Sequence, residues 1–388
     1  MSAVRTNTTS SLFGTKGHTS VSRGLAEFHA RRPVLISGRD ETLLTLPVEG
    51  LTAPRLAEFR ALCAPAVPNL IVTARRAVAI GLDALTPMAL QLTADQDARS
   101  ILSLVADTKC DCALTAAPAN QNASAAIQLV KLSKGLPAVL AAAVAPVDAA
   151  GREPKIISVD AEAIAGFAGE AIRSLTLASE ASVPLNSGAR TRFVVFRDGM
   201  GGSSVAIIVG KPDFTNPVPV RLHSACLTGD VFGSRRCDCG DQLTLAVARL
   251  EDIGGGIILY LPQEGRGLGL ANKMRTYEMQ DEGLDTVDAN TTLGFDDDER
   301  DYGTAARMLQ MLNCTRVVLL TNNPAKLDGL AKAGIEIASR MPLETPINSD
   351  NRRYLTAKAS RAGHRLDQLL ASLHENSSPE QDVAPLAT

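Results

Sequence analysis

The sequence of 388 residues contains no tryptophan, and aromatic residues make up only 3% of it. Nucleic-acid surfaces commonly combine aromatic stacking platforms with basic patches, and a formal net charge of −3 supplies no such basic excess. No apolar run reaches the roughly 20 residues that a membrane-spanning helix needs, and the N-terminus lacks the apolar core of a secretory signal. We therefore expect a cytoplasmic protein that binds neither nucleic acid nor membranes.

Cysteine is scarce, but its distribution is uneven. Three of the seven cysteines form a C-x₁₀-C-x-C pattern, Cys226, Cys237 and Cys239, within RLHSACLTGDVFGSRRCDCGDQL. Three thiolates so close together suit zinc, and three protein ligands leave the open fourth position of a catalytic site. Two alternatives remain at this point: a structural zinc completed by another ligand such as His223, or reduced thiols without a metal. The Cys110-Asp111-Cys112 stretch has no third cysteine at comparable spacing, so we interpret it as ordinary thiols.

The chain length accommodates two domains. Residues 1–20 and 375–388 are polar and are predicted to be disordered tails. A Ser-, Pro- and Gly-containing stretch at 179–191 is the expected linker between a first domain, 21–180, and a second, 184–372. In the first domain we expect a helix at 56–65, a strand at 69–74 and a helix at 124–135 that closes at Gly135.

The second domain alternates expected strands and helices. They are a hairpin at 192–210, a strand at 255–263, helices at 270–279 and 299–312, a strand at 315–320, and a helix at 325–334 that ends at Gly334. This alternation predicts an α/β (α+β) fold class, with a layered mixed sheet and helices in each of the two domains.

Four motifs follow one another in the second half of the chain: the cysteine stretch, QEGRGLG with the helix after it, LGFDDDERDYG and TNNPAKLDGL. In this order they resemble the GTP cyclohydrolase II family over residues 184–372. The resemblance implies zinc-dependent hydrolysis of GTP to 2,5-diamino-6-(5-phosphoribosylamino)pyrimidin-4(3H)-one, formate and diphosphate, the first step of riboflavin biosynthesis. It also implies one zinc ion per subunit on the three cysteines, Mg²⁺ with the GTP phosphates, and a homodimer. In the family, zinc-activated water attacks the imidazole ring, and C8 leaves as formate.

A glycine-rich turn between a strand and a helix lets backbone N–H groups approach phosphate oxygens. QEGRGLG has this context, so Glu264, Gly265 and Arg266 are candidate GTP contacts, with Arg266 suited to bidentate phosphate recognition. By the same resemblance the remaining GTP-site residues are Arg221, Leu222, His223, Ser224, Ala225, Gln242, Thr286, Thr321 and Lys326. Ala225 is a departure, because the family usually has Glu immediately before the first zinc cysteine.

The resemblance implies three catalytic residues. Asp298 matches a general base, Arg300 a nucleophile toward the α-phosphate, and Tyr277 a tyrosine near the reacting ring. We expect Asp298 and Arg300 at a helix N-terminus, where acidic residues also complement the helix dipole. A guanidinium stays protonated in proteins and is then a poor nucleophile, so electrostatic stabilisation by Arg300 is the alternative.

The first domain has a weaker resemblance to 3,4-dihydroxy-2-butanone 4-phosphate synthase. The family's acidic run would fall within GRDETLLTLPVEGL, and its histidine motif within NQNASAAI, but neither is present. Without clustered carboxylates and that histidine, we expect this domain to be inactive in that reaction. For the whole chain, two alternatives to the cyclohydrolase are a divergent paralogue of pyrimidine catabolism and a non-catalytic nucleotide-binding regulator.

Overall fold

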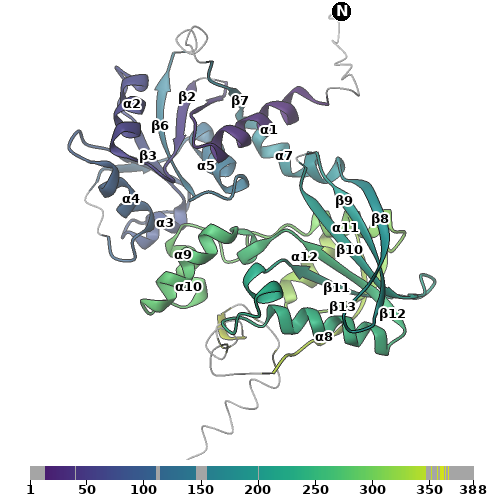
Figure 1. Ribbon diagram of the computed structural model, residues 1–388. Helices are drawn as coiled ribbons and strands as arrows, with labels where there is room; N and C mark the ends of the chain where they lie inside the picture. The colour runs from purple at the N-terminus through teal and green to yellow at the C-terminus, as the bar shows by residue number, and fades with distance from the viewer. Residues whose placement is uncertain are drawn as a thin grey trace, which may run out of the picture. The chain divides into compact units, whose positions relative to one another are not determined.

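The computed structural model describes residues 14–39, 41–110, 114–145, 155–199 and 201–346, together with 351, 356, 359–361, 363 and 366 (Figure 1). These residues form two compact units. The first contains the described residues up to Ser179, then Val195–Val205 and Leu261–Met308; the second contains Glu180–Val194, Ala206–Tyr260 and the described residues from Leu309 onward. Segment 261–308, which carries QEGRGLG and DDDER, therefore belongs to the same unit as the N-terminal part of the chain.

The first unit is built on a seven-stranded mixed sheet in the order β5-β4-β3-β6-β2-β1-β7. Its strands are β1 Val34–Ser37, β2 Thr42–Pro47, β3 Asn69–Val72, β4 Met88–Gln91, β5 Ala116–Pro118, β6 Ala138–Val144 and β7 Ser158–Asp160. Neighbouring strands are antiparallel, except for the parallel pair β1 and β7. Leu140 on β6 pairs with Leu46 and Leu70, and all three side chains are buried, so β6 forms the centre of this core.

Helices cover both faces of this sheet. They are α1 Lys16–His29, α2 Ala53–Cys63, α3 Ala74–Ala79, α4 Ala98–Ala106, α5 Gln121–Leu132, α7 Ala161–Arg173, α9 Leu270–Asp281 and α10 Thr286–Thr292. One core joins α1, α5 and α7 to the sheet through buried residues such as Val21, Leu129 and Phe167. The other joins α2 and α4 to apolar residues of the later segment, among them Leu293 and Phe295.

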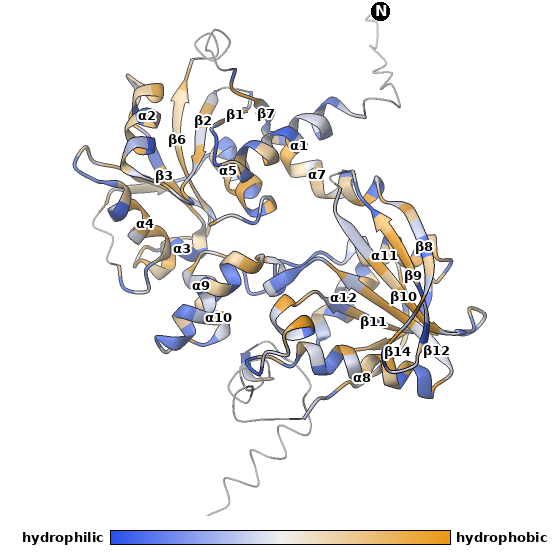
Figure 2. Cartoon of the chain, in the orientation of Figure 1, coloured by the Kyte–Doolittle hydropathy of each residue, from blue (hydrophilic) through white to orange (hydrophobic). Residues whose placement is uncertain are grey.

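The second sheet has the order β14-β13-β11-β12-β10-β9-β8. Its strands are β8 Thr176–Pro184, β9 Arg190–Arg197, β10 Ser203–Gly210, β11 Val218–Ser224, β12 Gly255–Leu261, β13 Arg316–Leu320 and β14 Glu336–Met341. Strand β13 lies parallel to both β11 and β14. The accompanying helices are α8 Cys239–Asp252, α11 Gly303–Met311 and α12 Pro324–Lys332. The buried interiors of β10 and β12 consist mostly of apolar residues (Figure 2).

The two-sheet α/β class is confirmed, and the expected strands and helices occur near their predicted positions. The expected linker at 179–191 is wrong, because β8 continues to Pro184 and β9 begins at Arg190. Strand β8 is an edge strand with an almost wholly exposed burial pattern, so it lacks the apolar alternation that would have revealed it. The helix expected at 299–312 begins only at Gly303, which leaves Asp298 and Arg300 in the loop before it.

Two further boundaries differ from the sequence-based expectation. Helix α1 begins at Lys16, inside the expected tail 1–20; the remainder of that tail up to residue 13, and all of 375–388, lie outside the described residues. Helix α5 ends at Leu132, and the left-handed residue that follows is Lys134, with a φ of 58°, rather than Gly135. Within the described ranges, no helix has both the length and the apolarity needed to cross a membrane.

Candidate functional site

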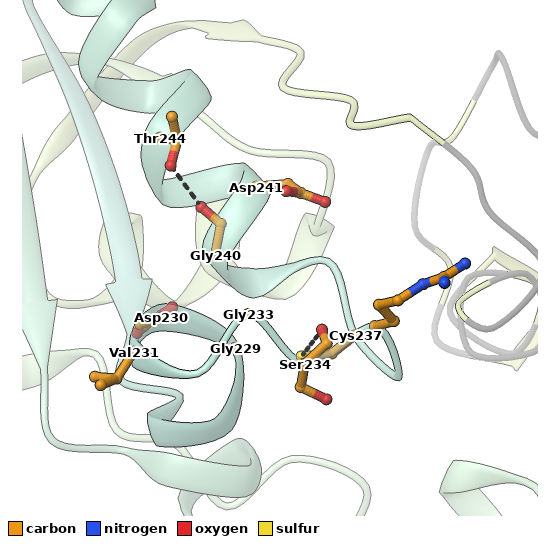
Figure 3. A pocket seen from close by; sticks show the side chains of 10 residues that line it. Gly229, Asp230, Val231, Gly233, Ser234, Cys237, Gly240, Asp241 and Thr244 are labelled. Carbon is orange, nitrogen blue, oxygen red and sulfur yellow. Dashed lines mark hydrogen bonds between the residues drawn. The ribbon is translucent and has the colours of Figure 1, made fainter. Parts of the chain in front are cut away.

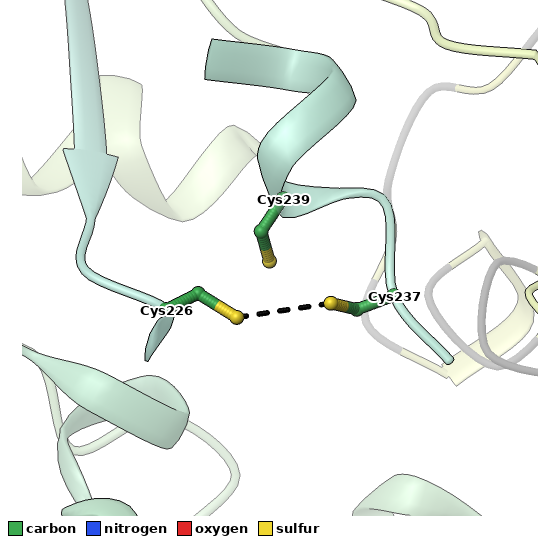
Figure 4. A group of neighbouring side chains, drawn as sticks. All are labelled: Cys226, Cys237 and Cys239. Carbon is green, nitrogen blue, oxygen red and sulfur yellow. Dashed lines mark hydrogen bonds between the residues drawn. The ribbon is translucent and has the colours of Figure 1, made fainter. Parts of the chain in front are cut away.

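Cys226, Cys237 and Cys239 point their sulfur atoms toward one another (Figure 4). Cys226 follows β11, Cys239 begins α8, and Cys237 lies in the loop just before that helix. The three Sγ atoms lie within 4.8 Å of one another, and the Cys226 and Cys237 sulfurs are 3.7 Å apart. Two thiolates on one tetrahedral zinc, each about 2.3 Å from the metal, would be separated by about 3.8 Å. The donor set and its spacing therefore fit a zinc ion.

The backbone around the cysteines is shaped to admit them. The short π-helix Leu227–Val231 brings Gly229 so close that an added Cβ would lie 2.9 Å from the Cys237 sulfur and 3.1 Å from the Cys226 sulfur. The Gly229 N–H also points at the Cys226 sulfur, 3.4 Å away. A second glycine, Gly240, lies where a Cβ would meet the Gly229 carbonyl oxygen at 2.4 Å. The contact with Cys226 raises the pKa of the Cys237 thiol, and a bound cation would oppose that effect.

Asp230 is a buried carboxylate that supports this cluster. It accepts hydrogen bonds from the Cys226 backbone N–H at 2.9 Å and from the Tyr260 hydroxyl at 2.9 Å. His223 Nε2 lies 3.1 Å from its Oδ1, and the His223 ring stacks on Tyr260 with a centroid separation of 5.5 Å. His223, considered above as a fourth zinc ligand, thus directs this nitrogen toward Asp230. Burial lowers the pKa of His223 despite the Asp230 hydrogen bond, which favours the neutral ring.

The predicted residues of the second unit gather at the ends of the parallel strands β11 and β13. Arg221 donates to the carbonyl oxygen of Leu320 at 3.1 Å and also to the Gln242 side chain. Lys326, on α12, donates to the Leu222 carbonyl oxygen at 2.7 Å. Thr321 directly follows β13 and is buried. The carboxyl ends of parallel strands are where open α/β sheets bind ligands, so the predicted grouping has the expected location.

A pocket of about 340 Å³ opens beside the cysteines (Figure 3). Cys237 and Asp230 line it, together with the π-helix and the first turn of α8. The remaining lining residues are Gly229, Val231, Gly233, Ser234, Arg235, Gly240, Asp241 and Thr244. The cluster is therefore accessible from a concave, largely polar surface.

In the first unit, QEGRGLG forms a tight turn after β12. Gly265 and Arg266 both have left-handed backbone conformations, with φ values of 62° and 60°, inside the short helical turn Glu264–Gly267. The Arg266 guanidinium donates to the Asp297 carbonyl oxygen at 3.2 Å, and the Glu299 N–H donates to the Arg266 carbonyl oxygen at 3.0 Å. These bonds hold the turn directly against the DDDER segment.

Asp298 and Arg300 form a bidentate ion pair. Arg300 Nε lies 2.7 Å from one carboxylate oxygen of Asp298, and Nη2 lies 2.6 Å from the other. Tyr302 donates from its hydroxyl to the same carboxylate at 3.2 Å. Burial alone would raise the pKa of Asp298, but the hydrogen bonds and charge of Arg300 outweigh it and lower that pKa. Asp298 is therefore ionised at neutral pH.

Tyr277 and Glu264 are linked through a residue that the motif comparison did not identify. The Lys273 ammonium lies 2.8 Å from a Glu264 carboxylate oxygen and 5.6 Å from the centre of the Tyr277 ring. Thr286, the first residue of α10, accepts a 3.5 Å hydrogen bond from Gln280. The first unit thus contains the predicted residues Glu264, Gly265, Arg266, Tyr277, Thr286, Asp298 and Arg300. The second contains Arg221, Leu222, His223, Ser224, Ala225, Cys226, Cys237, Cys239, Gln242, Thr321 and Lys326.

Sequence reasoning missed the residues that support these side chains: Gly229, Asp230, Tyr260, Lys273 and Tyr302. A signal for Asp230 was present, because it lies between Cys226 and Cys237 in the cysteine stretch. Tyr260 and Tyr302 gave no such signal, since a tyrosine in a strand or near a helix is more often a packing residue.

In the region where the first domain was expected to lack an acidic run, Glu49 binds Arg275 at 2.7 Å and Glu41 accepts a hydrogen bond from Asn120. Asp40, Asp111 and Cys112 lie outside the described residues. Among those described, the three cysteines are the one group of His, Cys, Asp or Glu residues arranged to hold a metal. The inactivity of this domain stays a prediction.

Comparisons with known proteins indicate the family of this chain. A family model for GTP cyclohydrolase II matches residues 176–342. A GTP cyclohydrolase-2 from Xylella fastidiosa (strain 9a5c) is 39% identical over 92% of this chain and 89% of its own length. A GTP cyclohydrolase-2 from Azotobacter vinelandii is 46% identical over 52% of this chain and 95% of its own length. A solved two-domain 3,4-dihydroxy-2-butanone 4-phosphate synthase from A. baumannii has 12% identity and a TM-score of 0.30, over 84% of this chain and 99% of that one, and is too remote to support an argument.

Proposed function

The chain belongs to the GTP cyclohydrolase II family, and we propose that it performs the family's reaction at a zinc centre formed by Cys226, Cys237 and Cys239. The reaction converts GTP to 2,5-diamino-6-(5-phosphoribosylamino)pyrimidin-4(3H)-one, formate and diphosphate, and begins riboflavin biosynthesis. The observation that carries the zinc assignment is the convergence of three cysteine sulfurs beside a polar pocket.

Zinc fits this donor set because thiolates are soft ligands and three of them leave one coordination position open. When bound, the ion supplies Lewis acidity and a water nucleophile at neutral pH. The chain's own contribution is to orient the ligands. The Gly229 N–H supports the Cys226 sulfur, and Asp230 fixes the Cys226 backbone while it holds His223 and Tyr260 in place.

The GTP phosphates are assigned to cationic and backbone groups. Arg266 lies in a glycine-rich turn in which Gly265 and Arg266 both have left-handed backbone conformations, and its guanidinium suits bidentate phosphate recognition. Within the second unit alone, Arg221 and Lys326 are buried cations at the strand ends, and each has a carbonyl partner that positions it. Mg²⁺ would enter with the substrate phosphates and keep several water ligands, so it needs few protein ligands.

For Asp298 and Arg300 we favour an electrostatic role. A carboxylate in bidentate contact stabilises the charged guanidinium, and a charged guanidinium is not a nucleophile. The same contact lowers the pKa of Asp298 and makes it a weaker base. Arg300 is therefore assigned to charge stabilisation at the α-phosphate, with Asp298 and Tyr302 setting its orientation. Tyr277 is assigned to the region of the guanine ring, where Lys273 orients it.

The first 179 residues are proposed to have no synthase activity of their own. The Xylella fastidiosa relative aligns over 89% of its length and is named only for the cyclohydrolase. Homodimerisation remains an expectation from the family. The paralogue of pyrimidine catabolism and the non-catalytic regulator make different predictions: the first would not release formate from GTP, and the second would release no product.

The decisive experiment incubates the zinc-loaded protein with GTP and Mg²⁺ and measures formate and diphosphate together. Equal amounts of both are expected. Diphosphate without formate would contradict the zinc assignment, because it would leave the phosphate chemistry intact without opening the ring. Retention of GTP without either product would contradict the proposed activity and favour the regulator.

A further inference from the structure

The end of helix α5 contacts two segments of the first unit: the DDDER segment, which carries Asp298 and Arg300, and the turn that carries Arg266. The Lys131 ammonium lies 2.5 Å from a Glu299 carboxylate oxygen and 3.5 Å from Asp296. Three residues later, the Lys134 ammonium donates to the Gly267 carbonyl oxygen at 2.8 Å. Glu299 directly follows Asp298 and precedes Arg300, and Gly267 directly follows Arg266. One helix end of the N-terminal part thus contacts the neighbours of all three residues.

The backbone at Lys134 has an unusual conformation for this residue type. Its φ of 58° lies in the left-handed region, which disfavours residues with a Cβ atom. The Asn272 side chain is fully buried and donates to the Lys134 and Gly135 carbonyl oxygens at 3.0 and 3.3 Å, and to Leu268 at 3.0 Å. Surrounding hydrogen bonds therefore hold Lys134 in a conformation that it would not adopt alone.

A second buried group joins the same two parts. Arg76 is 1% exposed and donates to carbonyl oxygens at the ends of two helices: Leu104 of α4 at 2.7 Å and Thr292 of α10 at 2.8 Å. The last carbonyl groups of a helix lack hydrogen-bond donors within the helix and carry partial negative charge. An arginine there donates the missing hydrogen bonds and its positive charge offsets the partial negative charge. Thr73 adds a 2.7 Å bond to the Gly294 carbonyl oxygen, next to where the DDDER segment begins.

The turn and the DDDER segment leave no free space between them. A Cβ on Gly267 would lie 2.8 Å from the Glu299 carbonyl oxygen and 3.2 Å from the Arg300 nitrogen. A shift of either backbone would therefore move Arg266 and Arg300 relative to each other. Misplacement of about 1 Å in a catalytic constellation can reduce turnover about a hundredfold.

We propose that Lys131 and Lys134 are positioning residues for GTP turnover, and that the N-terminal part of the chain holds the Arg266 turn in register with Asp298 and Arg300. The two lysines act through Glu299 and the Gly267 carbonyl group, without touching the substrate. This inference rests on the proposed function of Arg266 and Arg300 and assigns a role to a domain that lacks the synthase residues.

The test compares Lys131→Met and Lys134→Met in the full chain with Lys155→Met, an exposed lysine of the same part. Methionine keeps the length of the side chain and removes the charge. We expect kcat to fall about ten- to a hundredfold for formate and diphosphate alike in the first two variants, with KM and zinc content near wild type. Lys131→Arg, which keeps both ion pairs, should recover most of the activity.

A double-mutant cycle separates positioning from general destabilisation. If the Lys131–Glu299 pair is responsible, the single variant Glu299→Gln should reduce kcat. Adding Glu299→Gln to Lys131→Met should then lower kcat little further. Independent effects that multiply, or lysine variants as active as Lys155→Met, would overturn the proposal. Wild-type turnover, measured in parallel, separates failure of the proposed function from failure of the positioning role. An inactive wild type contradicts the proposed function. An active wild type with equally active lysine variants contradicts only the positioning role.

Discussion

Asp230 provides the sharpest test of how the cysteine cluster is held. Its carboxylate, with 4% of the side chain exposed, receives three donors: the Cys226 N–H, the Tyr260 hydroxyl and His223 Nε2. In Asp230→Asn the shape is kept, but one oxygen becomes an NH₂ group that cannot accept a hydrogen bond. At least one buried donor then loses its partner.

The size of the effect follows from the number of bonds lost. A buried donor left unsatisfied costs about 1–3 kcal/mol, so Asp230→Asn should lower the free energy of unfolding by about that amount. Loss of a group that orients a metal ligand typically reduces metal affinity about ten- to a hundredfold, and we expect that range for zinc. Tyr260→Phe removes one donor and leaves the carboxylate, so its effect on stability should be smaller, about 0.5–1.5 kcal/mol.

The assay is competition for zinc with a chelator of known affinity, together with urea unfolding of the zinc-loaded protein. Asp252→Asn is the matched control, because Asp252 is an exposed carboxylate at the end of α8. The reasoning is refuted if Asp230→Asn binds zinc as tightly as the control. Formate release should fall in proportion to the zinc lost and recover when zinc is added in excess.

Four further outcomes are expected. Cys237→Ser should lose zinc and formate release, and full activity in zinc-free protein would contradict the metal assignment. Gly229→Ala should weaken zinc binding, because its Cβ would lie 2.9 Å from the Cys237 sulfur; chelator competition measures this. Arg300→Ala should abolish turnover while zinc content, measured by atomic absorption, stays at the wild-type level; near-normal diphosphate release would remove Arg300 from catalysis. Because its folded pKa is lowered, Asp298 contributes stability that is present above its unfolded pKa of about 3.9 and is lost as the pH falls through the folded value. The stability difference between wild type and Arg300→Ala should therefore shrink in urea titrations below about pH 4, and a constant difference would contradict the ion pair.

The sequence predicts the candidate ligand and catalytic side chains more completely than it predicts the side chains that position them. Cys226 and Cys237 are recognisable because thiolates at close spacing are typical zinc ligands. Strand β12 and helix α12 are recognisable because buried apolar runs and a closing Gly334 have strong local signals. The spacing of the cysteines and the apolar pattern of a strand or helix are both contained in a short segment, so they can be recognised from the sequence of that segment.

What the sequence could not reveal depends on residues far apart in the chain. Arg76 caps a helix that ends 216 residues later, and Lys134 meets a carbonyl group 133 residues away. An arginine and a lysine near helix ends are ordinarily exposed and solvated, so nothing local distinguishes these two. The edge strand β8 was missed for the opposite reason: its exposure removes the apolar alternation by which strands are recognised.

The shorter Azotobacter vinelandii relative bears on the positioning role that we propose for the N-terminal part of this chain. That protein matches 52% of this chain over 95% of its own length, so it has no room for a counterpart of both halves. In this chain, however, Leu268, Leu293 and Phe295 are buried in one core with the N-terminal sheet. Removing that sheet would expose these side chains, each worth about 1.5–3 kcal/mol when buried, and would leave the Thr292 carbonyl group without Arg76. The family thus includes a relative that aligns with only about half of this chain, whereas here segment 261–308 is packed in one core with the N-terminal sheet.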